Sequence, residues 1–168
     1  MAQMEGSVIK FGNNINTDII SPPQYMELGI EESAKYAMSA VRPDFAEVVR
    51  TNKIVVAGDN FGSGSSRETS PLSLKYLGVD AVVAKFFARI FYRNSINVGL
   101  FVVECADADR IAENDRIRID YQNGVIYNNT KSEAYSCTRI PDHLMKLIEK
   151  GGLVAFLKSE LPGIMKMR

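Results

Sequence analysis

Short apolar runs alternate with longer stretches of helical periodicity through the middle of this chain. The runs are rich in valine and alanine, which is typical of parallel strands buried on both faces. Their positions are Lys53–Ala57, Val79–Ala84 and Leu100–Cys105. The stretches between them predict helices that end at glycines, over Ser65–Leu77 and Phe86–Asn97. This alternation predicts an α/β fold with parallel strands and right-handed crossovers.

The segments on either side of this alternation add further elements. A strand is predicted over Ser7–Phe11, followed by an irregular segment rich in Asn and Pro, Asn13–Met26. Two alternating runs flank Asn123-Gly124, which predicts an antiparallel hairpin. The other predicted elements are helices over Ile30–Val41, Phe45–Arg50, Ala106–Glu113 and Pro141–Lys150, and strands over Arg116–Tyr121, Val125–Asn129 and Glu133–Thr138. We therefore expect one α/β domain over residues 1–168, with a mixed sheet flanked by helices.

The composition excludes several classes of function. The 168 residues are 46% hydrophobic and 24% charged, as in ordinary globular chains, and acidic and basic residues balance at 20 each. This balance gives no general attraction for nucleic acid or for an anionic membrane, so any anion site has to be local. No signal peptide and no apolar run long enough to span a membrane is visible, so we expect a cytoplasmic protein.

The chain offers few ligands for a metal. It has two cysteines, Cys105 and Cys137, far apart in the sequence, and a single histidine, His143. Without a Cys-x-x-Cys pair these residues cannot form a zinc or iron–sulfur site by themselves. We therefore expect no metal bound by this chain alone, and we interpret both cysteines as small buried residues of a reducing compartment.

The residues after the first buried strand indicate a site for a small anion. The stretch "GDNFGSGSSRETSP" at 58–71 contains three glycines, two adjacent serines and one arginine. Backbone N–H groups at a helix start bind anions, and the planar guanidinium of Arg67 can hold a carboxylate with two hydrogen bonds. Ser65 and Ser66 offer hydroxyl groups that could cap the helix. The stretch lacks the lysine of a Walker loop and the third glycine of a dinucleotide fingerprint, so a plain turn with a serine cap remains an alternative.

Three stretches together resemble the aconitase superfamily, and specifically its small swivel domain as found in free-standing small subunits of the 3-isopropylmalate dehydratase type. They are "FGNNINTDIISP" at 11–22, the glycine–serine stretch at 58–71, and "AVVAKFFARIFYRNSINVGL" at 81–100. Their order and spacing also fit, and the similarity covers most of residues 7–155. The resemblance implies a swivelling β/β/α domain similar to the aconitase C-terminal domain, with residues 152–168 as a C-terminal helix or tail.

The resemblance also implies a hydro-lyase that moves a hydroxyl group between neighbouring carbons of a malate-like dicarboxylic acid. In such enzymes a 4Fe–4S cluster binds the substrate, and here the cluster would belong to a separate large subunit, because this chain lacks its ligands. By position, Ser65 corresponds to the base that removes the C–H proton, and Asp18 lies at the same active site. The residues that would bind the substrate or support the loop around it are Arg67, Ser66, Gly64 and Thr17.

The segment after the Thr-Asp pair decides which substrate the resemblance favours. In this family it contacts the variable group of the substrate, and enzymes for tricarboxylates place an arginine there. Here the segment reads Tyr25, Met26, Glu27 and Leu28, and no arginine or lysine follows until Lys35. A third carboxylate would meet Glu27 or an apolar side chain. We therefore favour a malate with an isopropyl group over dimethylmalate or other methyl-bearing malates, and over homoaconitate. Glu27 fits an alkyl pocket poorly unless it points to solvent.

Several alternatives remain open at the level of sequence. Family members commonly have histidine where this chain has Thr69, so no contact is assigned to that position. An anion-binding module without catalytic activity and a structural subunit with a decayed site are alternative functions, although intact Ser65, Arg67 and Asp18 argue against decay. The isolated chain could also form a homo-oligomer, since a near-neutral surface does little to oppose association.

Overall fold

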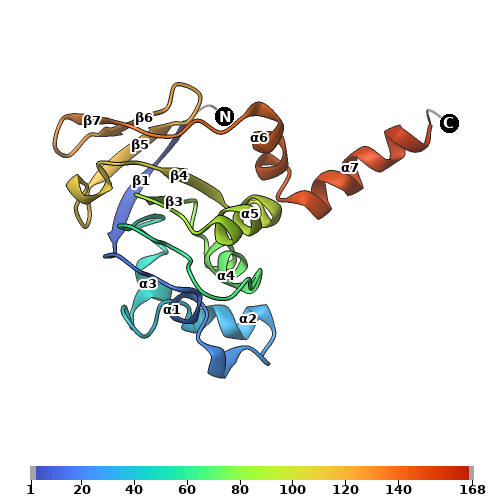
Figure 1. The fold of residues 1–168 in the computed structure, drawn as a ribbon, viewed down its shortest axis with the longest axis horizontal. Helices are drawn as coiled ribbons and strands as arrows, with labels where there is room; N and C mark the ends of the chain where they lie inside the picture. The colour runs from blue at the N-terminus through green and yellow to red at the C-terminus, as the bar shows by residue number, and fades with distance from the viewer. Residues whose placement is uncertain (1–2, 167–168) are drawn as a thin grey trace.

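The computed structural model describes residues 3–166, which contain one seven-stranded sheet (Figure 1). The strands are β1 (Gln3–Lys10), β2 (Ile54–Val56), β3 (Ala81–Ala84), β4 (Phe101–Glu104), β5 (Arg116–Asp120), β6 (Val125–Asn128) and β7 (Glu133–Ser136). Their order across the sheet is β4-β3-β2-β1-β5-β6-β7. The first four strands run parallel, and the last three continue the sheet in antiparallel fashion. The predicted α/β fold with a mixed sheet is confirmed.

The parallel half of the sheet is buried on both faces, as its valine-rich sequence predicts. Val55 and Val82 pair in register and belong to the cluster beneath the helices. Their neighbours Ile54 and Val83 belong to a second cluster on the opposite face. All four side chains are fully buried. Because burying one such side chain stabilises the fold by about 1.5–3 kcal/mol, this double-sided layer holds the strands in register.

The sheet curls until its two outermost strands are linked. Thr138, just after β7, donates its backbone N–H to the carbonyl oxygen of Glu104 in β4 at 2.9 Å. The hydroxyl oxygen of Thr138 accepts a hydrogen bond from the N–H of Glu104, also at 2.9 Å. The curled sheet surrounds an inner core that includes Val8, Ile54, Val83, Val103, Ile117, Ile119 and Ile126.

Seven α-helices within residues 3–166 surround or follow the sheet, and all but the last, α7, lie against the body of the molecule (Figure 1). They are α1 (Thr17–Ile20), α2 (Ile30–Ser33), α3 (Phe45–Val48), α4 (Thr69–Leu77), α5 (Arg89–Val98), α6 (Asp142–Glu149) and α7 (Leu153–Met165). The helices α4 and α5 pack against each other. Each ends at a glycine in the left-handed conformation, Gly78 (φ 98°) and Gly99 (φ 81°), as their positions predict.

The predicted start of α4 at Ser65 is wrong, because the helix begins only at Thr69. Gly62 (φ 83°) and Gly64 (φ 107°) have positive φ values, which belong to a loop and not to a helix. Pro71 lies in the first helical turn, where its missing N–H has no partner to lose. The N-cap position is Glu68, which makes no capping hydrogen bond. Ser65 and Ser66 therefore belong to a loop and do not cap the helix.

The helix predicted over Ile30–Val41 is also wrong as a continuous element. It is divided into α2 and a single 3₁₀ turn, Ala34–Tyr36. Met38 then adopts a left-handed conformation (φ 62°), and its N–H donates to the carbonyl oxygen of Ile19 at 3.2 Å. A long-range hydrogen bond thus replaces the local one that a continuous helix would require.

A third difference concerns Ala106–Glu113, where the predicted helix is only a 3₁₀ turn over Ala108–Arg110. The N–H of Ala112 donates to the side-chain Oδ2 of Asp115 at 2.8 Å. Aspartate side chains compete in this way for backbone donors, and they favour turns over continued helices.

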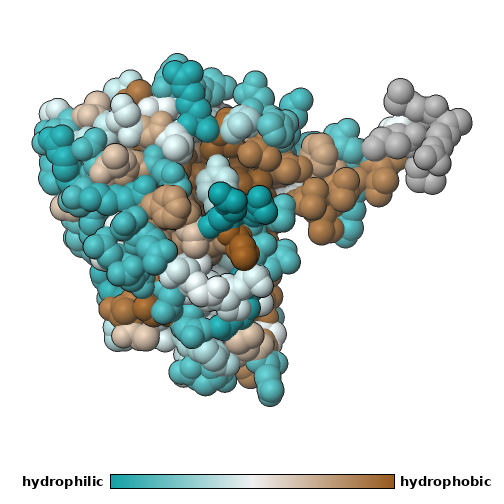
Figure 2. All heavy atoms as spheres, viewed as in Figure 1, coloured by the Kyte–Doolittle hydropathy of each residue, from teal (hydrophilic) through white to brown (hydrophobic). Residues whose placement is uncertain are grey.

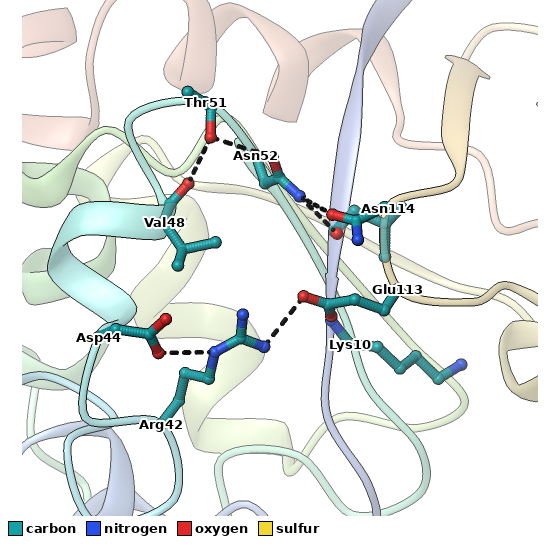
Figure 3. Close-up of polar contacts among 9 residues, drawn as sticks. Lys10, Arg42, Asp44, Val48, Thr51, Asn52, Glu113 and Asn114 are labelled. Carbon is teal, nitrogen blue, oxygen red and sulfur yellow. Dashed lines mark hydrogen bonds and ion pairs between the residues drawn. The ribbon is translucent and has the colours of Figure 1, made fainter.

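A polar network anchors the long crossover from β1 to β2 (Figure 3). Arg42, in the crossover, donates from Nη1 to Oε1 of Glu113 at 3.0 Å. The other carboxylate oxygen of Glu113 accepts a hydrogen bond from the backbone N–H of Lys10, at the end of β1 (2.6 Å). Asn52, at the far end of the crossover, donates to Oδ1 of Asn114 at 2.8 Å. Arg42 and Asn52 therefore hold the second part of the crossover to the rest of the sheet.

The last helix, α7, extends away from the rest of the molecule, and apolar side chains lie along it (Figures 1 and 2). Val154, for example, is 66% exposed. The helix follows two glycines with positive φ, Gly151 and Gly152. In the described part of the chain, no helix is both long and apolar enough to cross a membrane. The division between a core over residues 7–155 and a tail over 152–168 stays a prediction.

Neither cysteine forms a disulfide: Cys105 is buried and Cys137 is half-buried. Burial raises the pKa of the Cys105 thiol. Burial, with smaller contributions from the Cys105 thiol and the Asp120 carboxylate, raises the pKa of Cys137 to about 12.

Both thiols should therefore be unreactive in the folded chain, because the thiolate is the reactive form and a raised pKa suppresses it near neutral pH. We expect Ellman's reagent to modify the native protein at least about tenfold more slowly than the chain in denaturant, where thiol pKa values return to about 8.5. The measurement is a stopped-flow absorbance trace, with Cys137→Ser identifying each phase. A native thiol that reacts as fast as the denatured one would contradict this assignment.

Candidate active site

Two connections leave the carboxyl ends of neighbouring parallel strands and lie side by side. One follows β1 and contains residues 11–21, and the other follows β2 and contains residues 57–68. Ligands of α/β sheets commonly bind at this edge. Four backbone hydrogen bonds join the connections: Gly58 N–H to Gly12 O (3.0 Å), Asn14 N–H to Asp59 O (2.9 Å), Gly62 N–H to Ile15 O (2.7 Å) and Thr17 N–H to Ser63 O (2.8 Å).

The glycines of the second connection are needed for the close approach. A Cβ atom on Gly62 would lie 2.2 Å from the ring of Phe91, which is buried in the core. Gly64 has φ 107°, and a Cβ there would lie 3.1 Å from Oγ1 of Thr17. Both positions therefore require glycine, one for space and the other mainly for backbone conformation.

Thr17 fixes the backbone at Ser65. Its side chain is almost fully buried, and its Oγ1 accepts a hydrogen bond from the N–H of Ser65 at 3.0 Å. Asn16 begins the short helix α1 by accepting the N–H of Ile19 at its Oδ1 (2.9 Å), which orients the turn that carries Thr17. Ser65 itself is exposed, and its hydroxyl makes no hydrogen bond with any described residue. The loop thus presents a free hydroxyl on a positioned backbone.

Arg67 lies against the first connection as well. Its Nη2 forms an ion pair with Oδ1 of Asp18, and its Nη1 lies 2.8 Å from Sδ of Met26 and 3.4 Å from the carbonyl oxygen of Ser21. The Arg67 side chain is 19% exposed, whereas that of Asp18 is 58% exposed. A guanidinium carries five N–H donors, so donors remain for a ligand carboxylate after these contacts.

A small pocket of about 50 Å³ opens beside Arg67. Its lining is mostly apolar and includes Tyr25, Met26 and Leu28, three of the four residues predicted to contact the variable group of a substrate. The fourth, Glu27, is exposed and does not line the pocket. Thr69, to which the sequence assigned no contact, is a lining residue. The other lining residues are Ser21, Pro22, Ile30, Ser33 and Ser73.

Some contacts of the site were not anticipated from the sequence. Asn94, in α5, donates from Nδ2 to the carbonyl oxygen of Ser66 at 3.0 Å. Asn13 accepts the N–H of Asp59 at its Oδ1 (2.8 Å). The one local signal was the occurrence of asparagines within the stretches already singled out. The structure thus brings Asp18, Gly64, Ser65, Ser66, Arg67 and Met26 to one surface, with Thr17 buried against Ser65.

The residues described by the structure contain no group of three His, Cys, Asp or Glu side chains placed to hold a metal ion. The two thiols belong to the inner core and not to the loop surface. The groups that the chain presents at this surface are instead the hydroxyl of Ser65 and the guanidinium of Arg67.

Comparison with known proteins gives a consistent result. Residues 13–108 match the family model of the aconitase C-terminal domain. The chain is 50% identical to 3-isopropylmalate dehydratase small subunit 1 of Archaeoglobus fulgidus over 92% of this chain and 96% of that one. It is 49% identical to the 3-isopropylmalate dehydratase small subunit of Nautilia profundicola, over 96% and 98% of the two chains.

A solved structure agrees with the sequence relatives. The crystal structure of 3-isopropylmalate dehydratase from Methanocaldococcus jannaschii superimposes with a TM-score of 0.91 at 36% identity, covering 99% of each chain. The curled mixed sheet and its flanking helices are thus shared along the whole length. This chain belongs to the aconitase C-terminal domain family and, within it, to the small subunits of 3-isopropylmalate dehydratase.

Proposed function

We propose that this chain supplies one half of the active site of a two-subunit hydro-lyase that interconverts 2-isopropylmalate and 3-isopropylmalate, a step of leucine biosynthesis. A large subunit would supply the other half. The observation that carries the proposal is the pair of contacts between the two connections. Thr17 accepts the N–H of Ser65, and Asp18 pairs with Arg67, so a hydroxyl and a guanidinium are held at one exposed surface.

In the proposed reaction Ser65 transfers a proton. Its alkoxide removes the C–H proton of the substrate, the C–H electron pair forms a carbon–carbon double bond, and the hydroxyl group leaves the neighbouring carbon. Rehydration runs these steps in reverse on the other carbon, and Ser65 returns its proton. A 4Fe–4S cluster of the large subunit would act as the Lewis acid that polarises the leaving hydroxyl.

The surroundings of Ser65 suit a base of this kind. A serine hydroxyl is a very weak acid in water, so its alkoxide has to be stabilised by fixed dipoles and positive charge. Arg67 supplies the positive charge two positions along the loop, and the loop supplies N–H groups. Asp18 holds the guanidinium in place, which lets Arg67 bind a substrate carboxylate through its remaining donors without first losing side-chain freedom.

The pocket beside Arg67 supports an alkyl-substituted substrate. Its lining contains no charged side chain, and an apolar group gains free energy there by leaving water. A third carboxylate would find no positive partner in this pocket. We therefore favour the isopropyl-bearing acid over a tricarboxylate. A cytoplasmic location is part of the proposal, since two unpaired thiols suit a reducing compartment.

The proposal is tested with Ser65→Ala in the complex with the large subunit. We expect turnover to fall by about 10²–10⁴-fold, the usual contribution of a positioned acid–base group, while the complex still forms. The readout is the rate of isopropylmalate isomerisation under anaerobic conditions, with assembly followed by gel filtration.

Ser136→Ala, at an exposed position on β7, is the matched control and should keep full turnover. Normal turnover in Ser65→Ala would remove this residue from its role. A wild-type complex that binds malates without converting them would favour the alternative of a non-catalytic anion-binding module.

Two substitutions of Thr17 distinguish the role of its hydroxyl acceptor from the role of its side-chain shape. Thr17→Val keeps the shape but leaves the N–H of Ser65 without its partner, which costs about 1 kcal/mol and lets the loop move. We expect at least about a tenfold loss in kcat with KM less affected, whereas Thr17→Ser, which retains the acceptor, stays within about threefold of wild type. Equal kinetics for the two variants would contradict the positioning role.

The pocket makes a separate prediction about substrate choice. Leu28→Arg places a cation beside the pocket, so it should lower kcat/KM for the isopropyl acid and raise it for an analogue whose isopropyl group is replaced by a carboxylate-bearing chain. We expect the ratio of the two kcat/KM values to change by at least about tenfold. Leu161→Arg on α7, where the leucine is similarly exposed (47% against 45%), is the control and should leave the ratio unchanged.

A further inference from the structure

The connection from β3 into α5 directs two large apolar side chains into solvent. Phe86 is 52% exposed and Ile90 is 50% exposed, while their neighbours Phe87 and Phe91 are buried and stack with each other. The buried pair already serves the core of this chain. Exposing large aromatic and aliphatic side chains to water is unfavourable, so two of them within five residues of sequence indicate a surface that another molecule covers.

Unpaired positive charge lies beside Phe86. Arg89, Arg93 and Arg139 line a cleft of about 490 Å³ together with Phe86. The guanidinium groups of these three arginines form no ion pair and no hydrogen bond with any described residue. The carboxylate of the cleft, Glu104, accepts the backbone N–H of Phe87 at 3.2 Å. We call Phe86, Arg89, Ile90, Arg93 and Arg139 the arginine patch.

The arginine patch is joined by hydrogen bonds to the connection over residues 57–68, which carries Ser65. The N–H of Phe61 donates to the carbonyl oxygen of Phe86, and the N–H of Ala88 donates to the carbonyl oxygen of Phe61, both at 2.9 Å. From α5, Asn94 donates to the carbonyl oxygen of Ser66 at 3.0 Å. The patch therefore lies beside this connection. A partner that covers Ser65 would approach the patch as well.

We propose that the arginine patch is a docking surface for the large subunit, and that it receives an apolar segment of that subunit flanked by acidic side chains. This inference rests on the proposed function, which requires a second polypeptide to bring a cluster to Ser65. Exposed apolar and arginine side chains are the types that carry most binding energy in interfaces. A second copy of this chain is disfavoured as the occupant, because it would place three unpaired arginines against three others.

The test measures the dissociation constant of the complex with the purified, cluster-loaded large subunit by anaerobic sedimentation. We expect Phe86→Ala to weaken binding at least about tenfold. The control Tyr76→Ala removes an aromatic side chain of equal exposure (51%) from α4 and should bind as wild type does. Arg89→Glu with Arg93→Glu should weaken binding about a hundredfold or more and should reduce its dependence on salt.

The charge control is Arg50→Glu with Lys150→Glu, which changes net charge equally at exposed positions away from the cleft lining. Wild-type affinity in the patch variants would overturn the inference while leaving the proposed function intact. Failure of the wild-type chain to bind the large subunit, or an inactive wild-type complex, would overturn the proposed function itself. Self-association of the wild-type chain that Phe86→Ala abolishes would assign the patch to a second copy instead.

Discussion

The parallel pairing of β1 with β2 is the constraint on which the candidate site depends. It brings the ends of both strands to the same edge of the sheet, so two connections that are some forty residues apart in sequence emerge together. The pairing is fixed by side chains buried on both faces, because a slip of one residue would exchange the two clusters. Because the two connections lie side by side, Ser65 can donate its N–H to Thr17 and Arg67 can pair with Asp18.

Much of this architecture could be predicted from the sequence, but for different reasons in different places. The apolar runs located β2, β3 and β4 to within two residues, because strands buried on both faces have no polar positions to obscure them. The meeting of Asp18 with Arg67 followed only from the family resemblance, since no periodicity relates these positions. The sequence offered only an asparagine in a stretch already singled out, and it could not predict that Asn94 contacts Ser66, because this contact depends on how α5 lies beside the loop.

The wrong predictions share a physical cause. At Met38 a backbone N–H bonds to the carbonyl of Ile19, and at Ala112 one bonds to the side chain of Asp115. Helical periodicity takes no account of such competitors. The predicted helix start at Ser65 is too early, because the glycines before it belong to a loop. That difference favours the site, since an extended loop exposes the hydroxyl.

The hydrogen bonds between Thr138 and Glu104 have a consequence for a subunit that awaits its partner. An open sheet presents rows of unpaired N–H and C=O groups, which can template strand addition and fibril growth. Here a threonine beyond the last strand occupies the end of β4 with both its backbone and its hydroxyl. Another copy of the chain therefore cannot pair with β4 at this point. The subunit can thus accumulate before it binds its partner without polymerising through this strand end.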